Sequence, residues 1–285
     1  MKVHMDCIPC FLRQGLQATR FVTDDPNTQE RVLRRVMENL YWMQWSTTPP
    51  EMAHVVHNIV REETGTQDPY GKVKKQYNDI ALGIEAEMRE RIIGSDDPLM
   101  TAVKLAIAGN IIDFGAKSDF DLKETINQVL NDEMAINDLD EFVKALESAK
   151  TLMYNADNTG EIVLDKLLLE TILDNHEMER IVFVVKGAPI INDATMEDMS
   201  YVGLDKIPNI EFMEVGIGVP GTGMERSSPE FADILNSMDT VISKGQGNYE
   251  ALSEYQGVFF LLMAKCPVLS GELDVTMGSV VLKKG

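Results

Sequence analysis

The chain has 285 residues, of which 44% are hydrophobic, and its formal net charge is −20. This length and hydrophobic content suit one large domain or two smaller ones. The acidity argues against a nucleic-acid groove, because phosphate backbones are bound by an excess of Lys and Arg. The chain has no apolar run of about 18 residues, so no membrane span is expected. It also lacks the apolar core of a signal peptide, and we expect a cytoplasmic protein.

The first half of the chain is predicted to be almost entirely helical. Apolar residues recur at helical spacing over 31–45, and a Pro-Pro pair at 49–50 begins a second helix that Gly65 ends. Further amphipathic stretches cover 70–93, a segment from 99, 121–130 and 139–148. We expect about seven helices and assign residues 1–148 to a helical N-terminal domain.

The pattern changes after Thr151. Short apolar runs at 151–154, 180–185, 210–215, 240–243 and 257–263 alternate with helical or irregular segments, and residues 280–282 are a candidate edge strand. This alternation predicts a mostly parallel sheet. The predicted fold class is therefore α/β, in which residues 149–285 form a Rossmann-like domain that binds a metal and a phosphate.

The turn after the first of these strands carries the strongest local signal. Asp157 and Asn158 stand side by side, with Glu161 and Asp165 just beyond them at the start of a predicted helix. Oxygen donors of this kind suit hard divalent cations, and a helix N-terminus favours an anion. The alternative is an ordinary helix cap, for which Asp and Asn are also preferred.

Three later turns also follow predicted strand ends. They contain Asp193 (in residues 186–195), a glycine-rich loop (216–223) and Lys244 (in 244–250). In an open α/β sheet such strand ends converge on one crevice. Asp157, Asp193, the glycine loop and Lys244 can therefore share a site.

Five motifs together resemble the DUF89 family of metal-dependent phosphatases, and most closely its stand-alone archaeal members. They are AGNIIDFG (108–115), ADNTGEIVLD (156–165), VKGAPIINDAT (185–195), PGTG (220–223) and SKGQGNYE (243–250). The resemblance covers essentially the whole chain. It implies a helical domain on an α/β domain and the hydrolysis of phosphate esters of small metabolites, such as sugar phosphates, nucleotides or damaged phosphometabolites.

The resemblance also assigns residues. The family's metal ligands fall on Asp157, Asn158 and Asp193, and its phosphate-contacting lysine falls on Lys244. Asn110 and Asp113, three residues apart on one predicted helix next to Gly109, are expected to contact the substrate. The candidate substrate-binding set is Asn110, Asp113, Gly221, Thr222, Gly245 and Asn248.

The expected cofactor is a divalent metal. Two carboxylates and one amide suit Mg or Mn, and the family resemblance also leaves Co and Ni open. A divalent ion there would polarise the phosphoryl group and activate a water, while Lys244 would offset charge on the phosphoryl oxygens. Glu161 is predicted either to orient the attacking water or to act as a helix-capping acid. A phosphorylated Asp157 is a less favoured route, because the turn lacks an Asp-x-Asp spacing.

The three cysteines form a possible second site. Cys7 and Cys10 form a CxxC, and Cys266 follows Lys265. They could serve redox chemistry, form part of a metal site with His4, or be buried thiols. Archaeal relatives carry the same CxxC and Lys-Cys pair, which suggests that the two segments meet in space. The other histidines, at 54, 57 and 176, are not expected to be ligands.

The competing hypothesis is a nucleotide-binding or metal-binding protein without catalysis. The segment GIGVPGTG (216–223) resembles a phosphate-cradling glycine loop. It lacks the Gly-Lys-Ser/Thr ending of a P-loop and the full dinucleotide fingerprint. Phosphate release from an aryl phosphate, with and without Mn, would separate the two hypotheses.

Overall fold

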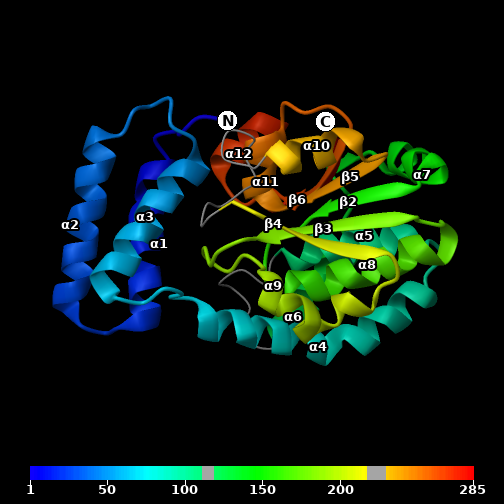
Figure 1. Cartoon of the computed structure of the whole chain (residues 1–285), viewed down its shortest axis with the longest axis horizontal. Coiled ribbons are helices and arrows are strands. Elements are labelled where there is room, and N and C mark those ends of the chain that lie inside the picture. The colour runs from blue at the N-terminus through cyan, green and yellow to red at the C-terminus, as the bar shows by residue number, and fades with distance from the viewer. Residues whose placement is uncertain (111–118, 217–228) are drawn as a thin grey trace.

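The computed structural model describes residues 1–110, 119–216 and 229–285. Three helices, α1 (Cys7–Val22), α2 (Pro26–Trp42) and α3 (Pro49–Thr64), pack beside one end of a central sheet (Figure 1). Thr48 and Glu51 form a capping box at the start of α3, and Gly65 ends that helix in the left-handed conformation. The three helices enclose a hydrophobic cluster of their own. We call α1–α3 the cap.

The rest of the described chain forms the sheet and its covering helices. The helices are α4 (Gly71–Ile93), α5 (Pro98–Gly109), α6 (Asp119–Asn131), α7 (Leu139–Ser148), α8 (Glu161–Asn175), α9 (Met196–Val202), α10 (Pro229–Ser237), α11 (Gly245–Leu252) and α12 (Pro267–Leu273). The strands are β1 (Ile136–Asn137), β2 (Thr151–Asn155), β3 (Arg180–Lys186), β4 (Ile210–Val215), β5 (Thr240–Lys244), β6 (Val258–Met263) and β7 (Val280–Lys284).

The strands form one sheet in the order β1-β7-β6-β5-β2-β3-β4. Every neighbouring pair is parallel except β6 and β7. The central strands β2, β3 and β5 are almost entirely buried, as their apolar sequences require. The predicted α/β class with a mostly parallel sheet is confirmed. The predicted edge strand at 280–282 is wrong in its position, because β7 lies between β6 and the short strand β1.

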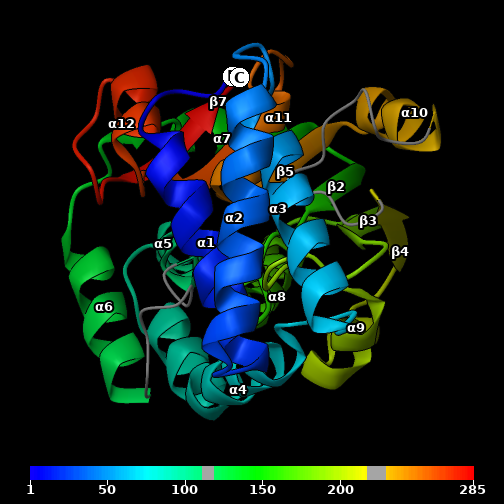
Figure 2. The same cartoon turned by 90° about the vertical axis from the view of Figure 1, so that its left-hand side faces the viewer.

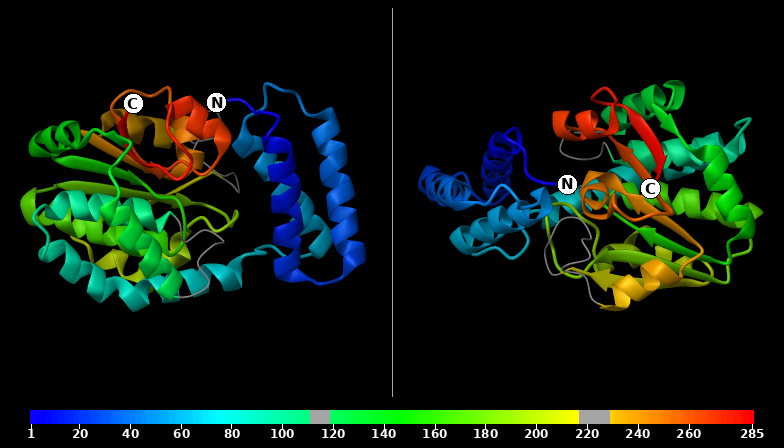
Figure 3. Two further views of the ribbon diagram at one scale, coloured as in Figure 1. Left: turned by 180° about the vertical axis from the view of Figure 1, so that it is seen from behind. Right: turned by 90° about the horizontal axis from the view of Figure 1, so that it is seen from above.

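Side chains alternate between the two faces of the sheet. Leu152 and Tyr154 of β2 belong to one hydrophobic cluster, together with residues of α4–α9, whereas Met153 belongs to a second cluster under α10–α12. Figures 1 and 3 show these helices on opposite faces of the sheet. The carboxyl ends of β2, β3 and β5 therefore open between the two helical layers, toward the cap.

The helical first half of the chain is divided between two hydrophobic clusters. Residues up to Tyr70 pack within the cap, whereas residues from Tyr77 onward pack against the sheet. Seven described helices precede β2, as expected, and the strand β1 interrupts them at residues 136–137. The domain boundary predicted after residue 148 stays a prediction. The change from the cap cluster to the sheet cluster falls earlier, between Tyr70 and Tyr77. Within the described residues, no helix is both long and apolar enough to cross a membrane.

Candidate active site

The turn that joins β2 to α8 places Asp157 and Asn158 at the carboxyl edge of the sheet. Gly160 occupies the N-cap position with a φ of 77°, so the N-cap has no side chain that could cap α8, and Asn78 Oδ1 accepts the Gly160 N–H at 2.7 Å. The Asp157 and Asn158 side chains instead bond to each other, because Asn158 Nδ2 donates to Asp157 Oδ2 at 2.8 Å. The alternative interpretation of this turn as an ordinary helix cap is therefore not supported.

Two amides hold the carboxylates of this turn. Asn110 Nδ2 donates to Asp157 Oδ2 (3.0 Å) and to Glu161 Oε2 (2.9 Å), and Asn158 Nδ2 donates to the same Glu161 oxygen at 3.0 Å. Because both amide nitrogens face carboxylates, each amide oxygen points the other way. Asn110 Oδ1 is buried and has no hydrogen-bond partner in the described part of the chain.

Asn110 lies at the end of a helix rather than within one. It is the C-cap of α5, and Gly109 is the last residue of that helix. The backbone at Gly109 lies close to α8, since a Cβ there would lie 3.1 Å from the Glu161 Cα. The glycine thus lets α5 pack against the start of α8 and brings Asn110 to the carboxylates.

Asp193 joins the same site from the loop after β3. Its backbone forms an isolated β-bridge with Asn158, and the next residue, Ala194, donates its N–H to the Asp157 carbonyl at 2.8 Å. Lys186, the last residue of β3, places its ammonium 3.8 Å from Asp193 Oδ2. Burial lowers the pKa of this lysine. The structure therefore brings Asp157, Asn158 and Asp193 together, as predicted.

The carboxylates are crowded in a way that favours a bound cation. Burial, and then the charges of Glu161 and Asp193, raise the pKa of Asp157 well above its usual range. A cation would relieve this repulsion, and the oxygen donors suit a hard divalent ion. Within residues 1–110, 119–216 and 229–285, no group of three or more His, Cys, Asp or Glu side chains is arranged to hold a metal ion. The predicted ligand set of Asp157, Asn158 and Asp193 has only two residues of these four types, because Asn158 contributes an amide.

Lys244 does not lie where a phosphate contact requires. Its side chain is fully buried, and its Nζ donates to Glu161 Oε1 (2.6 Å), Asp165 Oδ1 (2.6 Å) and the Ala106 carbonyl (2.8 Å). An ammonium has three protons, so these three bonds use all of them. The prediction that this side chain rises into the crevice disagrees with the geometry, because the two carboxylates of α8 attract it beneath the site.

Glu161 also has a different position from the expected ones. It is fully buried, and its two oxygens accept from Lys244 on one side and from Asn110 and Asn158 on the other. It therefore fixes the two amides rather than facing a water. Burial raises the pKa of Asp165, the second partner of Lys244, to about 7.

Gly245 and Asn248 shape the site through the backbone. Gly245 has a φ of 80°, and a Cβ there would lie 1.8 Å from Asp157 Oδ2, so a side chain would occupy the place of that carboxylate. Asn248 Nδ2 donates to the carbonyls of Ala156 (3.0 Å) and Lys244 (2.8 Å). These contacts hold the β2 and β5 ends together. The predicted substrate residues Asp113, Gly221 and Thr222 lie outside the described residues.

A cavity of about 330 Å³ opens over the carboxylates, between the sheet and the cap. All three cysteines line it together with Asp157 and Asp193, so the two cysteine-bearing segments do meet in space. Each is a free thiol, and burial raises the pKa of Cys7 and Cys10. Further lining residues are the apolar Phe11, Pro49, Pro50, Ala53, Ile191 and Val268, and the polar Gln14, Asn192, Gln246, Glu250 and Lys265.

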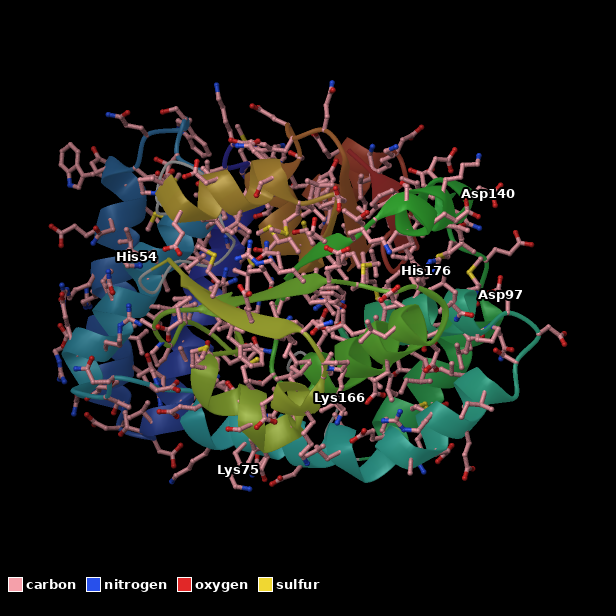
Figure 4. The ribbon with its side chains drawn as sticks, turned by 45° about the vertical axis from the view of Figure 1, so that its right-hand side comes forward. His54, Lys75, Asp97, Asp140, Lys166 and His176 are labelled. Carbon is pink, nitrogen blue, oxygen red and sulfur yellow. The ribbon has the colours of Figure 1, made fainter. Side chains whose placement is uncertain are left out.

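The histidines lie apart from this cavity. His57 is buried, and burial lowers its pKa to about 3. His54 bonds to Asn58 at 2.8 Å on the cap, and Figure 4 shows His176 at the far side of the molecule from it. None of these three lines the cavity.

The sequence assigned no role to Lys186, which lies beside Asp193, or to Asn192, which lines the cavity. Lys186 occurs in a Lys-Gly pair at the end of a strand, the same pattern that drew attention to Lys244-Gly245. Asn192 directly precedes the predicted ligand Asp193. Both signals are visible in the sequence, although only the structure distinguishes a lysine beside the ligands from one beneath them.

Replacing Glu250 with Gln is expected to stabilise the protein at pH 8 and not at pH 4. Burial raises the pKa of Glu250 to about 7 from an ordinary value of 4.5. Between pH 4.5 and pH 7, Glu250 loses its proton in the unfolded chain but keeps it in the folded chain. The free energy of unfolding therefore falls as pH rises through this range, and it stays lowered above pH 7. The gain at pH 8 should approach about 3 kcal/mol.

Urea unfolding at the two pH values measures this difference. Glu254→Gln, an exposed neighbour, is the matched control and should change little at either pH. Equal stability of Glu250→Gln and the unmodified protein at pH 8 would contradict the prediction.

Comparison with known proteins agrees with this architecture. The family model described as the damage-control phosphatase ARMT1-like domain matches residues 3–281. A damage-control phosphatase of Pyrococcus horikoshii is 33% identical over 285 residues, covering 99% of this chain and 97% of the relative. One of Archaeoglobus fulgidus is 33% identical over 293 residues, covering 99% of each.

An uncharacterised protein of Methanocaldococcus jannaschii is 35% identical, covering 100% of this chain and 96% of the relative. The crystal structure of a DUF89 family protein from Pyrococcus horikoshii matches with a TM-score of 0.91 and 31% identity, covering 100% of this chain and 99% of that one. The chain therefore belongs to the DUF89 family, as a protein with a damage-control phosphatase ARMT1-like domain.

Proposed function

We propose that this protein is a divalent-metal-dependent phosphatase that hydrolyses phosphate esters of small metabolites. The observation that carries the proposal is the convergence of Asp157, Asn158 and Asp193 on one cavity, beside the cationic Lys186. Two relatives named damage-control phosphatases, which match over nearly the whole chain, support the same activity. Damaged phosphorylated metabolites are accordingly the substrate class we favour.

The carboxylates of Asp157 and Asp193 and the amide oxygen of Asn158 would hold the metal, which we expect to be Mn, Mg, Co or Ni. When bound, such an ion polarises a phosphoryl oxygen and lowers the pKa of a water. Glu161 and Asp157 accept from the Asn158 nitrogen, which leaves the amide oxygen of Asn158 as the atom that would bind the metal. Lys186, which lies 3.8 Å from Asp193 Oδ2, would offset negative charge beside the phosphate. Lys244 is not available for this role, because its three protons are all used in hydrogen bonds beneath the site.

The cap contributes the wall that faces the organic part of the ester. Cys10, Phe11, Pro50 and Ala53 come from α1 and α3, and they line the cavity opposite the carboxylates. Figure 2 shows these helices in front of the sheet. A wall of this kind excludes water around the phosphate and strengthens each electrostatic contact there. A cavity of about 330 Å³ suits a small metabolite.

Phosphate release from p-nitrophenyl phosphate should stop in EDTA and return when Mn²⁺ is added in excess. The reason is that several acidic groups face the phosphate site, so the dianion meets repulsion unless a cation is present. The measurement is the rate of phosphate release from metal-stripped protein, with metal content checked by elemental analysis. Addition of Mg²⁺, Co²⁺ and Ni²⁺ in separate samples ranks the four candidate ions.

Two outcomes would contradict the proposal in different ways. Full activity of a sample that elemental analysis shows to be metal-free would remove the metal from the mechanism. No release from aryl, sugar or nucleotide phosphates with any of the four ions would favour a non-catalytic nucleotide- or metal-binding protein.

A further inference from the structure

The loop between β3 and α9 is held from two sides at the mouth of the cavity. From the cap, Arg61 Nη1 donates to the Pro189 carbonyl at 2.9 Å, and Ile191 packs against the hydrophobic cluster of α1–α3. From the sheet side, the Thr159 N–H and Oγ1 donate to the Asn192 carbonyl at 2.9 and 3.1 Å. The backbone of Asn192 is therefore fixed between the two parts of the molecule.

The residue before Asn192 has an unfavourable backbone conformation. Ile191 has a φ of 45°, in the left-handed region that a β-branched side chain rarely adopts. Such a conformation costs on the order of 1–3 kcal/mol and persists only where surrounding contacts impose it, most often at functional sites. Here the packing of Ile191 on the cap and the bonds to the Asn192 carbonyl impose it.

The side chain of Asn192 is buried but makes no hydrogen bond of its own. The residue is 1% exposed and lines the cavity. Neither its Nδ2 nor its Oδ1 has a hydrogen-bond partner among the described residues. Leaving both atoms unpaired costs free energy, so an apolar residue of similar size would suit a purely structural role better. An amide in this position is suited to a ligand.

We propose that Asn192 is a substrate-binding residue that recognises a hydroxyl group on the organic part of the phosphate ester. This inference rests on the proposed phosphatase function. A hydroxyl both accepts and donates, so it can pair with Nδ2 and Oδ1 of one amide, whereas a phosphate dianion only accepts. The unpaired Oδ1 of Asn110, which also lines the cavity, requires a donor as well. The site thus favours esters with hydroxyls close to the phosphate.

Glycerol 1-phosphate and propyl phosphate provide the test, because they share the phosphate and the three-carbon chain and differ only in hydroxyls. The unmodified protein, loaded with Mn²⁺, should prefer glycerol 1-phosphate by about tenfold or more in kcat/KM, the effect of one well-placed hydrogen-bonding group. Asn192→Leu should lose this preference, mainly through a higher KM for glycerol 1-phosphate. Its kcat/KM for propyl phosphate should remain close to the original.

Two measurements separate a binding role from a structural one. The melting temperature of Asn192→Leu should equal or exceed that of the unmodified protein, because two unpaired buried atoms are removed. Its affinity for Mn²⁺, measured by calorimetry, should not change. Asn236→Leu, at an exposed asparagine on α10, is the matched control and should keep the ester preference.

Any of three results would overturn the inference. They are equal use of the two esters by the unmodified protein, an ester preference that survives in Asn192→Leu, and a weakened Mn²⁺ affinity in that variant, which would make Asn192 a metal ligand. If neither these two esters nor the aryl, sugar and nucleotide phosphates are hydrolysed, the phosphatase proposal itself fails. The role of Asn192 is then decided by binding alone. Calorimetric dissociation constants of glycerol 1-phosphate and propyl phosphate are compared for the unmodified protein and for Asn192→Leu.

Discussion

Replacing Asp157 with Asn is expected to lower kcat/KM for phosphate esters by roughly 10³-fold, at the upper end of the loss seen when one electrostatic contact is removed. The metal-free variant should nevertheless unfold at the same temperature as the unmodified protein or at a higher one. Burial and the neighbouring Glu161 and Asp193 charges raise the pKa of Asp157, so its ionised form destabilises the folded state at neutral pH. Asn keeps an oxygen for the Asn110 and Asn158 amides and removes the charge.

The opposite signs of the two effects make this variant informative. Steady-state kinetics with Mn²⁺ measure the loss of turnover, and thermal unfolding in EDTA measures the gain in stability. The raised pKa of Asp157 lowers the stability of the unmodified protein only above the ordinary pKa of an aspartate. The stability advantage of Asp157→Asn should therefore increase from about pH 4 upward. Asp140→Asn, on the outward side of α7 in Figure 4, is the control and should alter neither property much. Near-normal turnover by Asp157→Asn would remove Asp157 from the metal site.

Replacing Lys244 with Met is expected to lower the free energy of unfolding by about 3–5 kcal/mol, the cost of breaking a buried ion pair from one side. Glu161 and Asp165 would lose the ammonium that lies 2.6 Å from each. Activity should fall as well, because Glu161 would no longer hold the Asn110 and Asn158 amides in place. Urea unfolding at pH 7 measures the first effect, and steady-state kinetics measure the second.

A second substitution tests the cause of this destabilisation. Lys244→Met combined with Asp165→Leu removes one of the two unpaired carboxylates, and it should be more stable than Lys244→Met alone. Lys75→Met is the control, because Lys75 also pairs with a carboxylate but is exposed on α4. A direct phosphate contact would give the reverse pattern, with stability retained and KM raised. That result would return Lys244 to the role expected from the family resemblance.

The fold could be predicted because its signals are local. Apolar runs of strand length after Thr151 and turn residues such as Gly65 fix the type of each element whatever lies around it. The partners of short strands could not be predicted in this way. Residues 136–137 form only two pairs with β7, and that pairing depends on a segment far along the chain.

The site could be predicted as a set of residues but not as a geometry. Asp157, Asn158 and Asp193 meet because strand ends converge, which is a property of the topology. The direction of the Lys244 side chain depends instead on Asp165, one helical turn beyond Glu161, and on the Ala106 carbonyl of α5. Two strand-end lysines followed by glycine look alike in sequence, and only the packing of α5 and α8 places one below the ligands and the other beside them.

The pairing of β1 with β7 has a consequence for synthesis of the protein. Ile136 pairs with Val281, so β1 has no partner until residues 280–284 have left the ribosome. At 5–20 residues per second, this delay is on the order of ten seconds. The α12 segment, which contributes part of the cavity wall, emerges within the same late interval. A nascent chain therefore carries its carboxylates for some time before the cavity closes, and the candidate site is complete only after residues 280–284 have been made.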